Sequence, residues 1–187
     1  MALSATQRRL FEIIKARSFS YGAEITLASG RKSNFYFNMK PTMLDPEGAS
    51  LIGQLVLEKL SEARADYVAG LEMGAVPMVS LIAAESFRAG DPVRAIFIRK
   101  RAKEHGTRQR VEGLIKDESL TGKRIVILED VTTTGGSAIQ AVKECRQAGG
   151  EVVRAITLVD RGEGAAEAFA KLGLSLDALF SAELFLD

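Results

Sequence analysis

The fold is decided by the stretch Ile125–Ser137, which reads IVILEDVTTTGGS. A short apolar run leads into two acids, then into hydroxyl residues and glycines, and a helical pattern follows as far as Gly149-Gly150. An uninterrupted apolar run of this length predicts a strand that is covered on both faces, as in a parallel sheet. Glycines before a helix let backbone N–H groups approach an anion, and the helix N-terminus adds partial positive charge. We therefore expect a phosphate-binding strand–turn–helix unit.

The same alternation extends outward from this stretch in both directions. Further short apolar runs occupy residues 67–71, 93–98 and 152–159, with helical patterns between them, and residues 177–185 fit a last edge strand. Ser4 with Gln7 forms a capping-box pattern, and Asp45-Pro46 marks another helix start. Strands that alternate with helices predict an α/β fold, with a mostly parallel central sheet flanked by helices. We expect one domain over residues 1–187.

Composition excludes several classes of protein. The chain has 187 residues, 47% of them hydrophobic, and a net charge of +1, which does not favour a general nucleic-acid binder. The single cysteine, Cys145, forms no internal disulfide, fits no zinc-ligand pattern and reads as a small core residue. No secretory or membrane-spanning pattern is present, so the sequence predicts a cytoplasmic protein that binds no membrane.

The residues around the glycine turn exclude two common phosphate-binding motifs. No Gly-Lys-Ser/Thr follows it, so it is not a Walker loop, and it lacks the dinucleotide pattern Gly-x-Gly-x-x-Gly. Glu129 and Asp130 suit sugar hydroxyls or a magnesium ion with its waters rather than a phosphate. The alternative is an ordinary strand–turn–helix unit whose threonines cap the helix.

This stretch resembles the phosphoribosyl pyrophosphate (PRPP) signature of the type I phosphoribosyltransferases. The resemblance implies that the turn holds the 5-phosphate, that the acids address the ribose, and that Asp130 is catalytic. This family usually carries two aspartates, whereas the first acid here is Glu129. Mg²⁺ is the expected cofactor, held mainly through PRPP and water rather than by protein ligands. The implied PRPP-binding residues are Glu129, Asp130, Val131, Thr132, Thr133, Thr134, Gly135, Gly136 and Ser137.

A second stretch is strongly basic and lies between two buried strands. Residues 99–106 read RKRAKEHG and resemble the mobile catalytic loop of the orotate phosphoribosyltransferases, here about residues 99–113. The resemblance implies that Arg99, Lys100, Lys103 and His105 contact the pyrophosphate, with Lys103 and His105 catalytic. It also implies a homodimer, in which the loop reaches the partner's site. A solvated charged loop is the alternative.

The base is indicated by Val159-Asp160-Arg161 at the end of an expected strand. A guanidinium grips a carboxylate with two parallel hydrogen bonds, and orotate carries a carboxylate. By resemblance, Arg161 and Thr133 bind orotate, while the segment Ser29–Asn38 belongs to a small N-terminal hood, mainly residues 18–40, that lines the base pocket. Otherwise Arg161 is a surface arginine and the hood aromatics are subdomain core.

The resemblance implies transfer of a phosphoribosyl group from PRPP to orotate in de novo pyrimidine biosynthesis. The chain departs from the family at Ala28 and in the loop Gly70–Pro77, where many members carry lysines. Three alternatives remain: a phosphoribosyltransferase for a purine or uracil, a regulatory protein that senses PRPP or binds RNA, and a nucleotide-binding domain without activity.

Overall fold

The computed structural model describes residues 3–26, 32–101 and 110–186. A six-stranded sheet at its centre has the order β5-β4-β3-β6-β7-β8. The short β5 runs antiparallel to β4, and the other neighbouring strands are parallel. The mostly parallel sheet expected from the sequence is confirmed. Its strands are β3 (Tyr67–Leu71), β4 (Arg94–Ile98), β5 (Val111–Glu112), β6 (Arg124–Thr132), β7 (Glu151–Asp160) and β8 (Leu176–Ser181).

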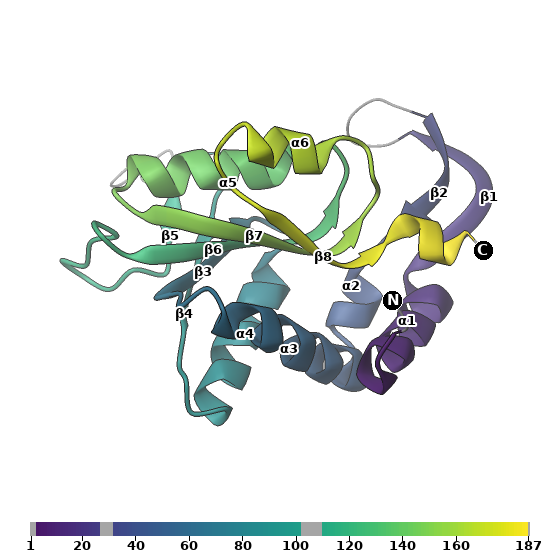
Figure 1. Cartoon of the computed structure of the whole chain (residues 1–187), viewed down its shortest axis with the longest axis horizontal. Coiled ribbons are helices and arrows are strands. Elements are labelled where there is room, and N and C mark those ends of the chain that lie inside the picture. Colours follow the sequence, from purple (N-terminus) through teal and green to yellow (C-terminus); the bar gives the residue numbers. More distant parts are fainter. Residues whose placement is uncertain (1–2, 27–31, 102–109, 187) are drawn as a thin grey trace.

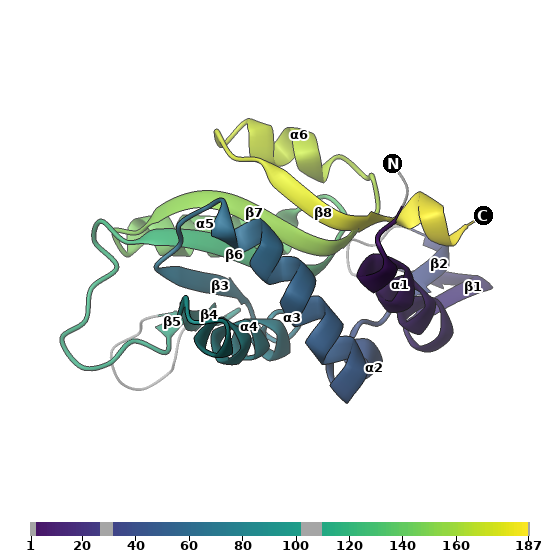
Figure 2. The same cartoon turned by 60° about the horizontal axis from the view of Figure 1, so that its bottom comes forward.

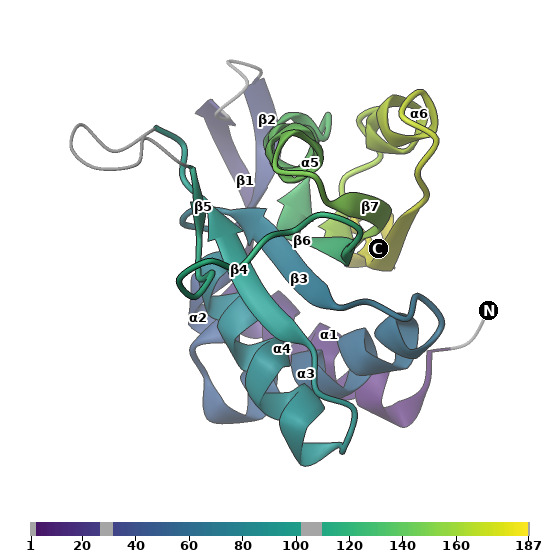
Figure 3. The same cartoon turned by 90° about the vertical axis from the view of Figure 1, so that its left-hand side faces the viewer.

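Helices cover both faces of this sheet (Figures 1 and 3). The helices α3 (Pro46–Ser61) and α4 (Val76–Arg88) lie on one face, and α5 (Gly136–Gln147) and α6 (Ala165–Ala170) lie on the other. Successive residues of a strand point to opposite faces. Accordingly Val126 packs in the α3–α4 core, whereas Ile127 packs against α5 and α6. Both faces are buried, which explains the uninterrupted apolar runs.

A separate antiparallel hairpin stands beside the sheet, with β1 (Phe19–Thr26) paired to β2 (Lys32–Phe37). It packs close to α1 (Ala5–Arg17) and to the C-terminal 3₁₀ turn η1 (Ala182–Phe185) (Figure 2). The Phe37 ring centroid lies 5.0 Å from those of Phe19 and Phe185. Aromatic packing of this kind attaches the hairpin to the rest of the chain.

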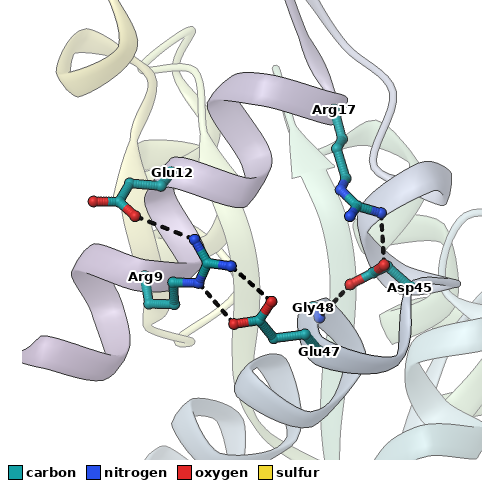
Figure 4. A network of polar contacts seen from close by, with 6 residues as sticks. All are labelled: Arg9, Glu12, Arg17, Asp45, Glu47 and Gly48. Atoms are coloured by element: carbon teal, nitrogen blue, oxygen red, sulfur yellow. Dashed lines mark hydrogen bonds and ion pairs between the residues drawn. The ribbon is translucent and has the colours of Figure 1, made fainter.

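An ion-pair network joins α1 to the N-terminus of α3 (Figure 4). Two guanidinium nitrogens of Arg9, Nε and Nη2, donate to the Glu47 carboxylate at 2.7 and 2.8 Å. Arg17 Nη1 lies 2.5 Å from Asp45, and Asp45 also accepts the Gly48 N–H at the start of α3. That amide is the largest cause of the lowered pKa of the Asp45 carboxyl. The predicted helix start at Asp45-Pro46 is confirmed.

The capping box at Ser4 and Gln7 is confirmed as well. The short helix α2 (Lys40–Met43) joins the hairpin to α3. Cys145 is fully buried in the α5–α6 core, as expected. Over the described residues, no helix combines the length and the apolar character that crossing a membrane requires.

Several element boundaries differ from the sequence prediction. Strand β6 continues through both acids to Thr132, because its register with β7 holds as far as Asp160. The helix after β7, for which the sequence predicts an end at Leu172, ends at Ala170. The predicted last strand ends at Ser181, whose hydroxyl accepts the Glu183 N–H and starts η1.

Candidate functional site

The turn between β6 and α5 has the backbone of an anion site. Gly135 adopts φ +83°, and a Cβ there would lie 3.2 Å from Cε2 of Phe169, so a side chain is disfavoured on two grounds. No side chain caps the N-terminus of α5. The first-turn N–H groups and the helix dipole are therefore available to an anion. The strand–turn–helix unit expected from the sequence is confirmed.

A pocket of about 250 Å³ lies beside this turn. The pocket lies at the C-terminal ends of the neighbouring strands β3 and β6. From β3 the chain order continues to β4 on one side of the sheet, and from β6 it continues to β7 on the other side. Ligands of open α/β sheets bind at such switch points. Its lining combines predicted site residues with others from the hairpin and from the loop after β3: Tyr36, Phe37, Leu71, Glu72, Gly74, Lys100, Glu129, Asp130, Val131, Thr133, Ser137 and Arg161.

Some predicted residues do not line this pocket. Thr134, Gly135 and Gly136 form the turn and the first position of α5. The Thr132 side chain is 1% exposed, and its hydroxyl has no hydrogen-bond partner among the described residues. A contact from this hydroxyl to a phosphate is therefore not supported by its position. A larger open hollow of about 1020 Å³, beside residues 110–120 and the end of α5, contains none of the predicted site residues.

The basic loop is described only at its two ends, and Lys103 and His105 lie outside the described residues. Arg99 donates its backbone N–H to the Arg110 carbonyl at 2.9 Å. Its guanidinium Nη1 lies 3.6 Å from the Glu112 carboxylate. Arg99 thus joins the two ends of the loop to each other, and it does not line the pocket.

The two acids of the motif occupy an environment that disfavours negative charge. Burial raises the pKa of Glu129 well above its ordinary value, and the neighbouring Asp130 carboxylate raises it further. Burial also raises the pKa of Asp130, against the Val131 N–H and the Lys40 ammonium, which both lower it. Glu129 Oε2 is buried without a hydrogen-bond partner among the described residues. Perturbed carboxyls in a cleft are typical of functional sites.

Arg161 follows β7 at the same edge of the sheet, and its side chain is 2% exposed. Its Nε donates to Glu163 Oε1 at 2.7 Å, and its Nη2 donates to Ser33 Oγ at 2.9 Å. Its Nη1 donates to the Phe35 carbonyl at 3.3 Å, and the guanidinium carbon lies 4.1 Å from the centroid of the Phe35 ring. The predicted base-contacting arginine therefore lines the pocket and also binds the hairpin.

The loop after β3 closes the pocket opposite the acids. A Cβ on Gly74 would lie 2.8 Å from Asp130 Oδ1, so glycine permits this close approach. The peptide bond between Glu72 and Met73 is cis. Glu72 donates its N–H to the Ile98 carbonyl and accepts the Lys100 N–H on Oε1, both at 2.8 Å. The loop after β3 therefore also holds the start of the basic loop.

Sequence reasoning missed three residues in this region. The Glu72 side chain accepts from the Lys100 N–H, Lys40 lies within electrostatic range of Asp130, and Glu163 pairs with Arg161. The spacing of Glu163, two residues after an arginine at a strand end, was a signal in the sequence. Nothing comparable indicated Lys40, because its proximity to Asp130 arises only in the folded chain.

The chain is a member of the phosphoribosyl transferase domain family, whose sequence pattern matches residues 42–173, including the turn between β6 and α5 and the acids beside it. The orotate phosphoribosyltransferase of Bradyrhizobium sp. (strain ORS 278) is 59% identical over 186 residues, which span the whole of both chains. That of Sorangium cellulosum (strain So ce56) is 44% identical, over 95% of this chain and 92% of the relative.

Solved structures agree with the sequence comparison. The Mycobacterium tuberculosis H37Rv orotate phosphoribosyltransferase in complex with PRPP is 31% identical, with a TM-score of 0.78, and the match covers 97% of this chain and 99% of that one. The chain belongs to the orotate phosphoribosyltransferase family.

Proposed function

We propose that this chain transfers the 5-phosphoribosyl group of PRPP to orotate, giving orotidine 5′-monophosphate and pyrophosphate in de novo pyrimidine biosynthesis. The observation that carries the proposal is one pocket lined by Thr133 and Ser137 of the phosphate turn, by the acids of β6 and by the Arg161 guanidinium. It therefore presents a phosphate-binding surface and a carboxylate-binding cation to the same small volume.

The proposed chemistry needs no protein nucleophile. N1 of orotate forms a bond to the anomeric carbon, while the bond from that carbon to the pyrophosphate oxygen breaks and its electron pair leaves with pyrophosphate. The transition state has oxocarbenium character, as in other glycosyl transfers. The work of the residues is to position two anions, to exclude water and to stabilise charge as it develops.

Each side of the pocket has a proposed role. The uncapped N-terminus of α5 and the hydroxyls of Thr133 and Ser137 bind the 5-phosphate. Asp130 and Glu129 bind the ribose hydroxyls, and in its ionised form Asp130 stabilises positive charge on the ribose. Arg161 binds the orotate carboxylate, beside Tyr36 and Phe37 of the hood.

Mg²⁺ is the cofactor that we propose. The buried Oε2 of Glu129 and the adjacent Asp130 are oxygen donors of the kind that this ion prefers. Over the described residues no three acidic, histidine or cysteine side chains gather closely enough to hold a metal by themselves. Most of the ligands would come from PRPP and water, with the two acids beside them. A Mg²⁺ ion held in this way would neutralise charge on the phosphate oxygens.

We also propose a homodimer in the cytoplasm, built from a single phosphoribosyltransferase domain with a mobile catalytic loop at about residues 99–113. Arg99 holds the two described ends of that loop together, through the Arg110 carbonyl and the Glu112 carboxylate. Supply of the loop to the neighbouring site would explain why Arg99 itself does not line the pocket of its own chain.

The direct test is to mix the purified protein with Mg²⁺, PRPP and orotate and to follow the loss of orotate. We expect orotidine 5′-monophosphate and pyrophosphate in equal amounts. Parallel incubations with uracil and with adenine identify a different base preference. Binding of PRPP by calorimetry, without turnover of any base, would support a binding protein and overturn the proposal.

The proposed role of the basic loop is tested by Lys103→Ala. Loss of an ammonium that stabilises the departing pyrophosphate is expected to lower kcat by about 100-fold, with an unchanged melting temperature. Lys116→Ala is the matched control, because Lys116 is exposed on the described stretch after β5 and lies outside the pocket. Equal kcat values for the two variants would contradict a catalytic role for Lys103.

A further inference from the structure

The base-facing side of the pocket contains a buried ion pair whose acid has no place in the reaction as proposed. Arg161 and Glu163 meet at 2.7 Å, and their side chains are 2% and 16% exposed. Two elements separated by 128 residues converge on this pair, because Ser33 of β2 accepts from the same guanidinium. This pair is much less exposed than an ordinary surface ion pair. Removing charges from water costs free energy, so a small gain in stability does not explain why the pair is buried.

The hydrogen bonds of Arg161 account for three of its five N–H groups. One bond leaves from each nitrogen: Nε to Glu163, Nη1 to the Phe35 carbonyl and Nη2 to Ser33 Oγ. Among the described residues, this leaves one N–H on each of the two terminal nitrogens. Two donors at the end of a guanidinium match the two oxygens of a carboxylate. Arg161 lines the pocket, so a ligand carboxylate there has a pair of donors to meet.

The orientation of this donor pair depends on the Nε edge. The Phe35 ring supports one face of the guanidinium, with 4.1 Å between the guanidinium carbon and the ring centroid, but stacking alone leaves rotation within the ring plane free. The bond from Nε to Glu163, at 2.7 Å the shortest of the three and the one to a carboxylate, restricts that rotation together with the bonds to Ser33 and the Phe35 carbonyl. The carboxylate of Glu163 also balances a cation that is otherwise buried before any ligand binds.

We infer that Glu163 is a positioning residue that sets the affinity for the carboxylate of the base, by fixing Arg161 edge-on between the hairpin and the pocket. This inference rests on the proposed function, and it deepens that function by naming a determinant of base specificity. Ser33 completes the arrangement from the hairpin: its hydroxyl accepts from Arg161 and donates to the Phe35 carbonyl at 2.9 Å. Glu163 and Ser33 thus accept from two different nitrogens of one guanidinium.

The test compares Glu163→Ala, Glu163→Gln and Glu167→Ala under steady-state conditions. Glu163→Ala is expected to raise the KM for orotate about 10-fold and to leave the KM for PRPP within about 2-fold, as expected for loss of one well-oriented contact to a charged group. Gln keeps an acceptor for Nε, so Glu163→Gln is expected to recover most of the affinity for orotate. Glu167→Ala removes a nearby exposed carboxylate on α6 and should match the wild type.

The outcomes separate the inference from its rivals. Equal rises in both KM values, with a lower melting temperature, would show a merely structural role. A lower KM for orotate in both Glu163 variants would show that Glu163 only opposes the charge of the ligand. If Glu163→Ala does not fold, Ser33→Ala provides the test from the hairpin, with a rise of about 3-fold expected in the KM for orotate alone.

The experiment also separates failure of the inference from failure of the proposed function. An active wild type whose KM for orotate does not respond to Glu163→Ala overturns only the role of Glu163. A wild type that forms no nucleotide from orotate and PRPP overturns the proposed function, and the inference fails with it.

Discussion

The two sides of the pocket are built in opposite ways. The phosphate side is one contiguous segment, in which strand β6 delivers Glu129 and Asp130 and the chain turns at once into α5. The base side joins residues that are more than a hundred positions apart, because Arg161 donates to both Ser33 and Phe35. The phosphate side is therefore formed by local backbone geometry, and the base side only by tertiary packing.

Their electrostatics differ just as clearly. On the phosphate side, burial raises the pKa of both carboxyls, and Glu129 Oε2 has no hydrogen-bond partner among the described residues. On the base side, Arg161 is paired on every nitrogen and supported by a ring. Uncompensated buried groups cost stability, and sites retain them where function needs them. The comparison indicates that the phosphate side is completed by its ligands, whereas the base side is preformed.

Asp130→Asn should produce the largest effect, and on the phosphate side alone. Asparagine keeps the size of the side chain but loses the negative charge that stabilises an oxocarbenium-like ribose. We expect kcat to fall by about 100-fold, the typical cost of one preorganised polar group, while the KM for orotate stays within about 2-fold. Initial-rate measurements with each substrate varied in turn check this outcome.

Asp91→Asn is the matched control for this variant, because Asp91 is an exposed residue between α4 and β4, outside the pocket. A large rise in the KM for orotate in Asp130→Asn would show that the two sides do not act separately. A kcat within about 3-fold of the wild type would remove Asp130 from the catalytic role.

Arg161→Lys should give the next largest effect, on the base side. Lysine keeps the charge but has three donors on one nitrogen instead of a planar fork of five. If it met both Glu163 and Ser33, it would have no pair of parallel donors left for a ligand carboxylate. We expect the KM for orotate to rise about 10- to 30-fold, while the KM for PRPP stays nearly constant.

Arg154→Lys, on the same strand β7, is the control for this variant. Its guanidinium pairs with Glu62 and Asp177 and lies outside the pocket. If Arg161→Lys raised the KM for orotate and the KM for PRPP equally, Arg161 would serve mainly to hold the hairpin. The pocket would then have no side that is specific for the base.

The same contrast explains what the sequence predicts and what it does not. The sequence predicts the main helices and strands, because the patterns that indicate them are local: hydrophobic periodicity, a glycine turn and two helix-start patterns. The order of the strands in the sheet is not a local property. The turn between β6 and α5 and the acids before it are also local, so the sequence predicts where they lie in the fold. The buried position of the Thr132 hydroxyl is a property of the packed sheet.

The base side could be predicted only in part. A strand end identifies Arg161, but no local pattern links it to Ser33, which approaches through the packing of a separate hairpin. Lys40 near Asp130 has the same origin, because its position depends on where α2 lies after the chain folds. Contacts between distant segments carry no periodic signal in a single sequence.

The smallest effect concerns stability, and Glu129→Gln should reveal it. The pKa of Glu129 in the folded chain lies above its ordinary value of 4.5, so the folded state holds a proton that the unfolded state releases as the pH rises from about 4.5. The free energy of unfolding of the wild type therefore falls as the pH rises from about 4.5 towards the raised pKa of Glu129. Glutamine carries no charge and avoids this loss.

At neutral pH, Glu129→Gln is thus expected to be more stable than the wild type by on the order of 1 kcal/mol, or about 2–4 °C in Tm, and less active. Below about pH 4 the two proteins should converge, because Glu129 is then protonated in both states of the wild type. Urea unfolding at several pH values measures the difference. If the difference in the free energy of unfolding between the two proteins did not change with pH, burial would not raise the pKa of Glu129. The contrast between a ligand-dependent phosphate side and a preformed base side would then lack its energetic basis.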